Sequence, residues 1–497
     1  MKIKQMGISL ILIMGVVLNG FSISKPNILL VLADDLSPEN LGVYGGSIPT
    51  PHLDRLADNG VYLQHAWATP MCGPTRAMVL TGCGAQRTGN WHNALNVRPD
   101  QKNAYDLAGN HLFISKAMKD AGYATAVAGK PHMIGSNPMS NKVGFEQYCL
   151  HNLFVKDLPA GSEFDGKLET EASLPGWNNP VTSRYWHPCV VQNGKLLDTT
   201  DHDFGDEMFA DFLVDFIADS NADDRPAFGL FMMALPHTTA GADDRSQRDR
   251  VPFPTTPLSG RPGENYNGTW EECIEYIDTL MGSIQKQLEE KGLAENTIII
   301  FTTDNGDQHS GAKMSATEPG ARVPVIIAGP AEHIKVEGSS DILFSLADLL
   351  PTCVAWAGGE VPSTDVIDGI NQADFLAGKA PAPRKWLDSY CGTARLVRDM
   401  DWCLEAVDPF EGFSEGRLYR YTEEGGRLLI KEEEMTKPSK QAKARLMAHL
   451  DQLPYFDRSM PHIDAALIRY LSAPHRHKQV FVNGKMWYME LAKELQE

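Results

Sequence analysis

The sequence has no excess of basic residues and no internal repeat. Its 64 Asp and Glu residues outnumber 45 Lys and Arg residues, which gives a net charge of −19. A basic nucleic-acid-binding surface is therefore not expected, and any anion site must be locally positive against an acidic background. The 43 glycines and 31 prolines follow no triplet period, which excludes a collagen-like chain.

Cysteines are also sparse. An exported chain could pair some of the eight, but their density is low for 497 residues, and their spacings form no zinc-binding pattern.

Long hydrophobic runs are missing beyond the N-terminus. Residues 8–17 form a short apolar run, with Lys2 and Lys4 before it and the small residues Ser22 and Ser24 after it. This pattern predicts a cleaved signal peptide over residues 1–24 and a periplasmic or secreted protein. No Cys follows the run, so a lipoprotein anchor is not supported. No later stretch is long and apolar enough for a membrane span after signal removal.

The remaining composition, with 42% hydrophobic and 22% charged residues, is typical of a folded globular protein. Short apolar runs alternate with helical patterns, which predicts a mostly parallel sheet with helices on both faces. The runs are 27–33, 123–128, 228–235, 297–303 and 323–328, and the helical patterns are 112–121, 209–217, 271–290 and 341–357.

A Pro- and Ala-rich segment at 380–383 marks a predicted boundary. Beyond it, short strands with turn signals at 396–407 and 418–431 indicate a smaller antiparallel α+β unit, closed by a helix over 465–471. We therefore expect an N-terminal domain over 25–383 and a C-terminal subdomain over 384–497.

Polar residues follow four of the five runs. They are Asp34-Asp35, Lys130 with His132, His237, and Asp304-Asn305. Each alone fits a turn, a helix cap or a structural residue. Because ligands bind beyond the carboxyl ends of the strands in open α/β sheets, their joint placement predicts one site.

The residue types in this set point to a cation and an anion together. Oxygen ligands from Asp34, Asp35, Asp304 and Asn305 suit Ca²⁺ or Mg²⁺ better than Zn²⁺. The same region offers Arg76, Lys130, Lys313 and the two histidines. A divalent cation beside several basic groups indicates a tetrahedral oxyanion between them, such as a phosphate or sulfate ester.

The segment Cys72-Gly73-Pro74-Thr75-Arg76 is the most specific pattern. Pro74 suits the first turn of a helix, which would place Cys72 at a helix N-terminus, where anions are favoured. A buried or disulfide-bonded cysteine and a low-pKa thiolate nucleophile are the simpler interpretations. Neither explains the oxygen-rich metal set.

These residues resemble the signature of the type I sulfatases, in the alkaline phosphatase superfamily. That signature is Cys-x-Pro-Ser-Arg, three variable residues and Leu-Thr-Gly, and Thr75 here replaces the usual Ser. Pro131 and Pro319 stand where the family usually has Trp and Gly. Similar segments cover about residues 25–355, at 27–35, 50–57, 122–132, 144–146, 236–237, 304–313, 318–324 and 348–352.

The resemblance implies an alkaline-phosphatase-like fold, with a large mixed, mostly parallel sheet sandwiched by helices and a smaller C-terminal subdomain containing an antiparallel sheet. It implies that a formylglycine-generating (sulfatase-maturating) enzyme oxidises Cys72 to formylglycine (3-oxoalanine) before folding is complete. One Ca²⁺ ion would be bound by Asp34, Asp35, Asp304, Asn305 and the modified Cys72.

The implied reaction is sulfate ester hydrolysis. One hydroxyl of the hydrated aldehyde attacks sulfur in line, while Arg76, Lys130 and Lys313 hold the sulfate oxygens. His237, together with Lys313, protonates the leaving alcohol. His132 then takes the proton of the second hydroxyl, sulfate is expelled and the aldehyde returns.

Three functions stay open on the sequence. An exported sulfatase acting on a sulfated carbohydrate is favoured by the complete set of site residues. A phosphodiesterase or phosphonate monoester hydrolase would use the same nucleophile. A non-catalytic glycan-binding protein would follow if Cys72 stays a thiol.

Several residues are weaker candidates for substrate contact, with a solvated or packed role as the competing interpretation. They are His92, Asn93, Arg98 and His309 in loops, Tyr185, Trp186 and His187 in a long insertion over 150–200, and the basic run 469–478.

Overall fold

The computed structural model describes residues 25–91, 107–132, 138–151, 185–186, 188–200, 202–237, 253–260, 268–409, 412–423 and 425–454, and the short strands β16 (Phe481–Val482) and β17 (Lys485–Met486). The expected signal peptide and the expected helix over 465–471 lie outside the described residues. No helix in the described part of the chain is long and apolar enough to cross a membrane.

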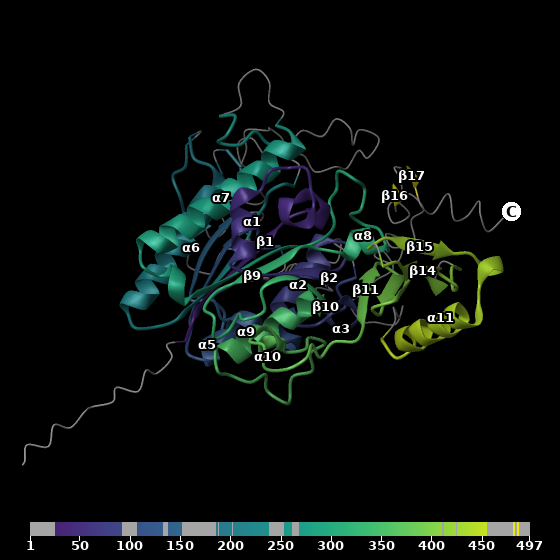
Figure 1. The fold of residues 1–497 in the computed structure, drawn as a ribbon. Coiled ribbons are helices and arrows are strands. Elements are labelled where there is room, and N and C mark those ends of the chain that lie inside the picture. The colour runs from purple at the N-terminus through teal and green to yellow at the C-terminus, as the bar shows by residue number, and fades with distance from the viewer. Residues whose placement is uncertain are drawn as a thin grey trace, which may run out of the picture.

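A ten-stranded mixed sheet forms the centre of the larger part of the molecule (Figure 1). Parallel pairing joins β3, β7, β1 and β8 in its middle, and β10 with β2 at one edge. β9 pairs antiparallel with both β8 and β2. In spatial order the strands are β10 (Gly338–Ser345), β2 (Gly60–Trp67), β9 (Val325–Ala328), β8 (Thr297–Thr303), β1 (Asn27–Ala33), β7 (Ala227–Met232), β3 (Ala124–Gly129), β4 (Gln147–His151), β5 (Val190–Gln192) and β6 (Lys195–Leu196).

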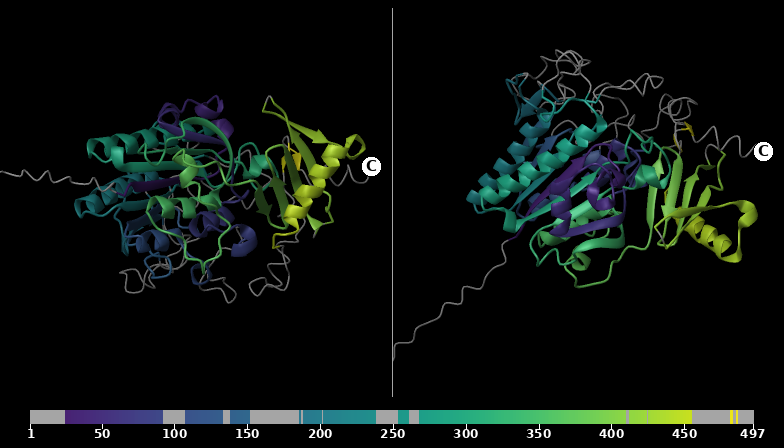
Figure 2. Two further views of the ribbon diagram at one scale, coloured as in Figure 1. Left: turned by 60° about the horizontal axis from the view of Figure 1, so that its bottom comes forward. Right: turned by 45° about the horizontal axis from the view of Figure 1, so that its top comes forward.

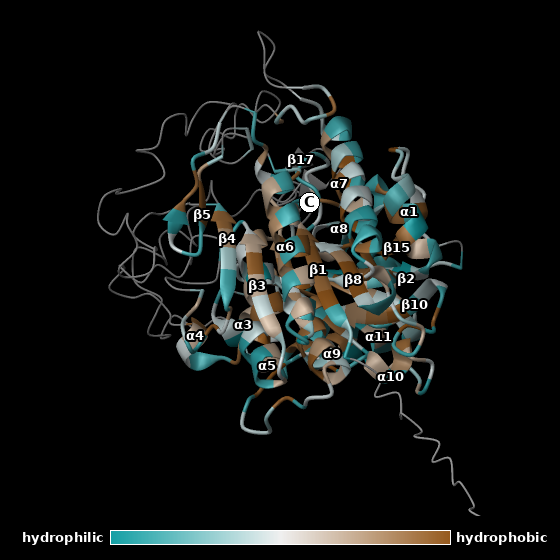
Figure 3. Ribbon diagram, turned by 90° about the vertical axis from the view of Figure 1, so that its left-hand side faces the viewer, coloured by the Kyte–Doolittle hydropathy of each residue, from teal (hydrophilic) through white to brown (hydrophobic). Residues whose placement is uncertain are grey.

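Helices cover both faces of this sheet, as Figures 2 and 3 show. β1 is buried along its whole length, and its side chains alternate between the two faces. Ile28 and Leu30 join the core under α2 (Cys72–Thr81), α5 (Ile114–Asp120), α9 (Leu349–Trp356) and α10 (Ala373–Leu376). Leu29 and Val31 join the core under α1 (Pro51–Asp58), α6 (Gly205–Ala222) and α7 (Trp270–Glu290).

A separate five-stranded antiparallel sheet lies in the C-terminal part of the chain. Its strands are β11 (Leu387–Cys391), β12 (Ala394–Arg398), β13 (Trp402–Val407), β14 (Arg417–Tyr421) and β15 (Arg427–Ile430). On one face, Leu446 and Leu450 of α11 (Lys437–Leu450) pack against the sheet. The opposite face packs against Trp67 and Leu343 of the large sheet.

The predicted fold class is therefore confirmed, and β1 and β8 have the predicted bounds. The predicted helix over 341–357 is wrong in its first half, because residues 338–345 form β10 and only Leu349–Trp356 is helical in α9. β10 is a strand because it pairs in parallel with β2, a strand that the sequence analysis did not predict. The domain boundary near residue 383 stays a prediction, and β11 begins at Leu387.

Gly129 ends β3 directly before Lys130 and allows close packing of the backbone. Its φ of 95° is left-handed, and a Cβ atom there would lie 2.0 Å from the carbonyl oxygen of Met232. Gly122 has a φ of 90°, but a Cβ atom there would meet nothing within 4 Å. Alanine substitutions at the two glycines therefore separate the cost of backbone strain from the cost of steric overlap.

We predict that Gly129→Ala lowers the free energy of unfolding by about 2–5 kcal/mol, because strain and overpacking add. Gly122→Ala should cost only about 1–2 kcal/mol, from strain alone. Denaturant unfolding of both variants measures the difference. Equal losses would contradict the close approach of the two strands at Gly129.

Candidate active site

The carboxyl ends of four central strands deliver polar side chains to one edge of the large sheet. Backbone hydrogen bonds continue beyond the strands and fix these ends together. The N–H of Asp304 donates to the carbonyl oxygen of Ala33 at 3.1 Å, and the N–H of Asp34 donates to that of Leu235 at 2.9 Å. The N–H of Lys130 donates to that of Met232 at 2.6 Å.

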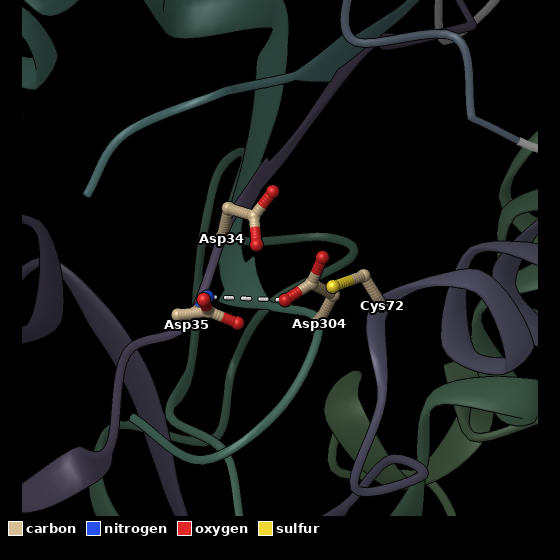
Figure 4. Close-up of side chains that lie close together, drawn as sticks. All are labelled: Asp34, Asp35, Cys72 and Asp304. Atoms are coloured by element: carbon tan, nitrogen blue, oxygen red, sulfur yellow. Dashed lines mark hydrogen bonds between the residues drawn. The ribbon is translucent and has the colours of Figure 1, made fainter. Parts of the chain in front are cut away.

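Three of the delivered carboxylates meet the thiol of Cys72. One ligand atom from each of Asp34, Asp35, Cys72 and Asp304 lies within 4.8 Å of the others, and all four residues are buried (Figure 4). Segments more than 200 residues apart in sequence therefore converge at one point, as predicted.

The backbone at Asp35 explains how two successive aspartates reach the same pocket. In an extended strand, neighbouring side chains point to opposite faces. Asp35 instead has a left-handed φ of 68°, which turns its side chain back toward the site. Its N–H donates to Oδ1 of Asp304 at 3.1 Å, and its own Oδ1 accepts from Nδ2 of Asn305 at 2.7 Å.

Cys72 is the first residue of α2, as the position of Pro74 predicted. The turn before the helix is held by Thr75, whose Oγ1 accepts from the N–H of Thr69 at 2.9 Å and lies 2.7 Å from the Thr69 hydroxyl. Thr75, which stands where the resemblance has Ser, therefore holds this turn through its hydroxyl. All ten residues of α2 are buried, so Cys72 is held rigidly at the helix N-terminus.

A buried guanidinium binds the carboxylates from two strands. Nε of Arg76 donates to Oδ2 of Asp304 at 2.9 Å, and Nη2 lies 3.3 Å from Oδ2 of Asp34. The remaining donors reach backbone carbonyls, with Nη1 at 3.3 Å from that of Lys130 and Nη2 at 3.2 Å from that of Met233. Arg76 is therefore held by strand ends and acts as the centre of the site.

Two ammonium groups complete the charge balance. Nζ of Lys130 pairs with Oδ2 of Asp34, and Nζ of Lys313 lies 2.6 Å from Oδ2 of Asp35. Three carboxylates therefore face three cationic side chains, counting Arg76. With all three carboxylates ionised the pocket is close to neutral, and a divalent cation would then leave it positive enough to attract an anionic ester.

The carboxylates do not ionise alike in this crowded pocket. Burial would raise the pKa of Asp34, but Lys130, His237 and Arg76 outweigh it, and the pKa lies well below its ordinary value. Burial raises the pKa of Asp35 to about 7 despite Lys313, and it also raises the pKa of Asp304. A second positive centre near these oxygens would allow all three groups to ionise together.

Two oxygen atoms have the environment of metal ligands. Oδ1 of Asp34 and Oδ1 of Asn305 are buried and have no hydrogen-bond partner among the described residues. Buried polar atoms are usually paired, so two such oxygens beside three carboxylates are suited to bind a cation. The donor set contains only oxygens apart from the Cys72 sulfur, and it fits a hard cation such as Ca²⁺.

The Cys72 thiol itself is poorly suited to be the nucleophile. Burial raises its pKa to about 12, with Asp34 and Asp304 adding to the effect and Lys313 opposing it, so it stays protonated at neutral pH. None of the eight cysteines forms a disulfide. The simple thiolate and disulfide interpretations of this segment are therefore not supported.

The two predicted histidines also lie at this edge. His237 is close enough to Asp34 to lower its pKa, and its carbonyl oxygen accepts a hydrogen bond from the hydroxyl of Tyr185. Burial, with Lys130 and Arg76, holds the pKa of His132 well below its ordinary value. His132 is therefore neutral at neutral pH, and its Nδ1 has no hydrogen-bond partner among the described residues.

The weaker candidates separate into packed and exposed residues. Trp186 is buried, and its Nε1 donates to the carbonyl oxygen of Thr255 at 2.9 Å, so it is a packed aromatic residue. His309 is exposed and stacks on Trp270 at a ring distance of 5.7 Å. The contact between Tyr185 and His237 was not predicted, because no local pattern joins residues 52 positions apart. His92, Asn93, Arg98, His187 and the run 469–478 lie outside the described residues.

Solved structures share this fold. The crystal structure of Ps i-CgsB matches with a TM-score of 0.66, covering 92% of this chain and 100% of that chain at 24% identity. The same protein in complex with k-i-k-neocarrahexaose matches with a TM-score of 0.64. The structure of BT4656 in complex with its substrate D-glucosamine-2-N,6-O-disulfate has a TM-score of 0.54, covering 86% of this chain and 98% of that chain at 18% identity.

Sequence relatives are sulfatases by name. Steryl-sulfatase of Mus musculus is 28% identical over 445 residues, covering 74% of this chain and 67% of its own length. N-acetylgalactosamine-6-sulfatase of Rattus norvegicus is 29% identical over 370 residues, covering 70% of this chain and 64% of its own length. The family model described as Sulfatase matches residues 26–359, which is most of the chain. The chain therefore belongs to the sulfatase family of the alkaline phosphatase superfamily, a family of sulfuric ester hydrolases.

Proposed function

We propose that the protein is an exported hydrolase that removes sulfate from a sulfated carbohydrate, with Cys72 oxidised to formylglycine and one bound Ca²⁺ ion. The observation that carries this proposal is the convergence of Cys72 with three carboxylates within 4.8 Å, paired with Arg76, Lys130 and Lys313. The carbohydrate is supported by two structure neighbours whose complexes hold a neocarrahexaose and a disulfated glucosamine.

The oxygens of Asp34, Asp35, Asp304 and Asn305, with the modified residue 72, would hold the Ca²⁺ ion. When bound, the ion would polarise a sulfate oxygen and favour the deprotonated nucleophile. The formylglycine oxygens would take the place of the Sγ atom of Cys72. Once hydrated, that aldehyde offers one hydroxyl for attack on sulfur and a second for the later expulsion of sulfate.

The protein's own side chains would then orient and neutralise the substrate. The Nζ atoms of Lys130 and Lys313 face the pocket, where each pairs with a carboxylate. Arg76 binds the carboxylates that surround its guanidinium group. His237 would give a proton to the leaving alcohol oxygen, since a sugar alkoxide is a poor leaving group. His132 is neutral and would accept a proton from the nucleophilic residue during sulfate release.

Oxidation of Cys72 would have to precede folding. Cys72 is 1% exposed and lies in a helix whose ten residues are all buried, so no enzyme can reach it in the folded protein. We propose that a formylglycine-generating enzyme acts on the extended chain. The predicted signal peptide over residues 1–24 would then direct the protein to the periplasm or the exterior.

We predict that Cys72→Ala abolishes turnover of sulfate esters. The thermal unfolding midpoint should stay nearly unchanged, because the substitution removes only the Sγ atom of a small side chain. Mass spectrometry of the peptide with Cys72 should show an aldehyde in place of the thiol when the host supplies the maturating enzyme. Parallel assays with phosphate and phosphonate esters separate the alternative reactions. Full activity of Cys72→Ala would refute the assignment of the nucleophile.

Calcium should stabilise the folded protein. At a concentration 100 times its dissociation constant, one ion adds about 2.7 kcal/mol to the free energy of unfolding. Chelator-treated protein should therefore unfold at a lower temperature and recover when Ca²⁺ is added. Asp35→Asn should weaken this response. An unfolding midpoint of the unaltered protein that does not change when Ca²⁺ is added would contradict the proposed metal site.

His237→Ala should affect substrates according to their leaving groups. We expect a loss in kcat/KM of about 10²-fold or more on sugar sulfates, which need protonation, and a much smaller loss on activated aryl sulfates. His132→Ala serves as the matched control, because a role in sulfate release is common to both substrates. Equal losses on the two substrates for His237→Ala would count against its role as the general acid.

A further inference from the structure

A group of buried charged side chains joins the C-terminal sheet to the loop that carries Lys313. Glu318, at the start of α8 (Glu318–Ala321), follows Lys313 by five residues. Its Oε1 atom accepts hydrogen bonds from Nη1 of Arg398 at 2.7 Å and from the hydroxyl of Tyr421 at 2.7 Å. The guanidinium of Arg398 also lies 3.9 Å from the centre of the Tyr421 ring.

A second carboxylate from the C-terminal sheet completes the group. Oε1 of Glu405 accepts from the backbone N–H of Glu318 at 2.7 Å. Arg427 pairs with Glu405 and lies 3.7 Å from Oε2 of Glu318. We call these five residues the Glu318 network: Glu318, Arg398, Glu405, Tyr421 and Arg427. Its two carboxylates and two guanidinium groups balance in charge.

The backbone of β13 is distorted at the same contact. Ala406 has a left-handed φ of 58°, which is uncommon for a residue with a side chain. The pairing of β12 with β13 shifts register between Arg395 and Val397. In this conformation, the N–H of Ala406 leaves the sheet and donates to the carbonyl oxygen of Ala316 at 3.1 Å. The distortion therefore serves the contact with the loop.

The loop over residues 304–324 links this contact to the candidate active site. It begins with the proposed metal ligands Asp304 and Asn305, and it carries Lys313. The N–H of Met314 donates to the carbonyl oxygen of Pro70 at 2.7 Å, two residues before Cys72. Apart from the four-residue α8, the loop has no regular structure, so its shape depends on the groups that hold it.

The network is not needed to attach the two sheets. Apolar residues already fill their interface, with Trp67 and Leu343 packed against Leu387 and Leu396. Burying charges is costly, and a buried ion pair is a weak source of stability compared with apolar residues of similar size. Glu318, Arg398 and Glu405 are at most 7% exposed, and the hydrogen bonds between them join the C-terminal sheet to α8. A role in fixing geometry accounts for these observations together.

We propose that the Glu318 network positions the loop over 304–324, so that the C-terminal sheet sets the geometry of Lys313 and of the residues around Cys72. The residues of the network are positioning residues. The expected effect on turnover rests on the proposed function, whereas the effect on the loop does not.

Glu405→Gln tests this inference with an isosteric change that removes one charge. We expect faster hydrogen exchange in the backbone amides of residues 306–317, and a fall in kcat of about 10- to 100-fold from misplaced groups. Arg384→Gln is the matched control, because it breaks the buried ion pair with Asp348 and leaves the Glu318 network intact. It should lower the thermal unfolding midpoint without changing exchange at 306–317 or kcat.

A conservative pair of variants adds a rescue. Arg427→Lys keeps the charge beside Glu405 and should retain most of the exchange protection at 306–317, whereas Arg427→Gln should lose it. Unchanged exchange in Glu405→Gln, or equal exchange changes in Arg384→Gln, would overturn the inference. If the unaltered protein turns over no sulfate ester, the proposed function fails, and hydrogen exchange alone still decides the role of the network.

Discussion

The rest of the site depends on the contacts of the Arg76 guanidinium group. It is fully buried and binds carboxylates that follow two different strands, while its other donors reach backbone carbonyls at the ends of two more elements. A buried guanidinium is tolerated only with such complete pairing. The same contacts that satisfy its charge therefore also hold the strand ends in register around Cys72.

The sheet explains why those strand ends meet. Parallel pairing of β3, β7, β1 and β8 places their carboxyl ends at one edge. Two apolar cores, one on each face, make these strands rigid along their whole length. The polar residues can then crowd together without distorting the strands, since the cost of gathering like charges is met by a large amount of buried apolar surface. Local backbone features such as the left-handed Asp35 complete the geometry.

The sequence predicted which residues gather beyond the strand ends better than it predicted the strands at the periphery of the sheet. Buried apolar runs such as 27–33 are readily predicted as central strands. The positions of the residues that follow these runs are then fixed by the sheet. By contrast, β2 and β10 were missed or misread, because neither is a continuous apolar run. β2 has Gln64 and His65 in its middle, and β10 begins with polar residues and is a strand through its pairing with β2. The Glu318 network was also beyond prediction. Its members come from five places between residues 318 and 427, and their pairing depends on how two sheets dock.

The burial of Cys72 has a consequence for any preparation of this protein. Since Cys72 is buried at the start of α2, the proposed oxidation of its thiol to an aldehyde would occur only during synthesis and could not take place afterwards. Two molecules with the same fold would then differ permanently in the side chain at residue 72. The specific activity of a sample would then depend on the fraction of its chains that were oxidised before they folded. It would not simply measure the fraction of chains that are folded.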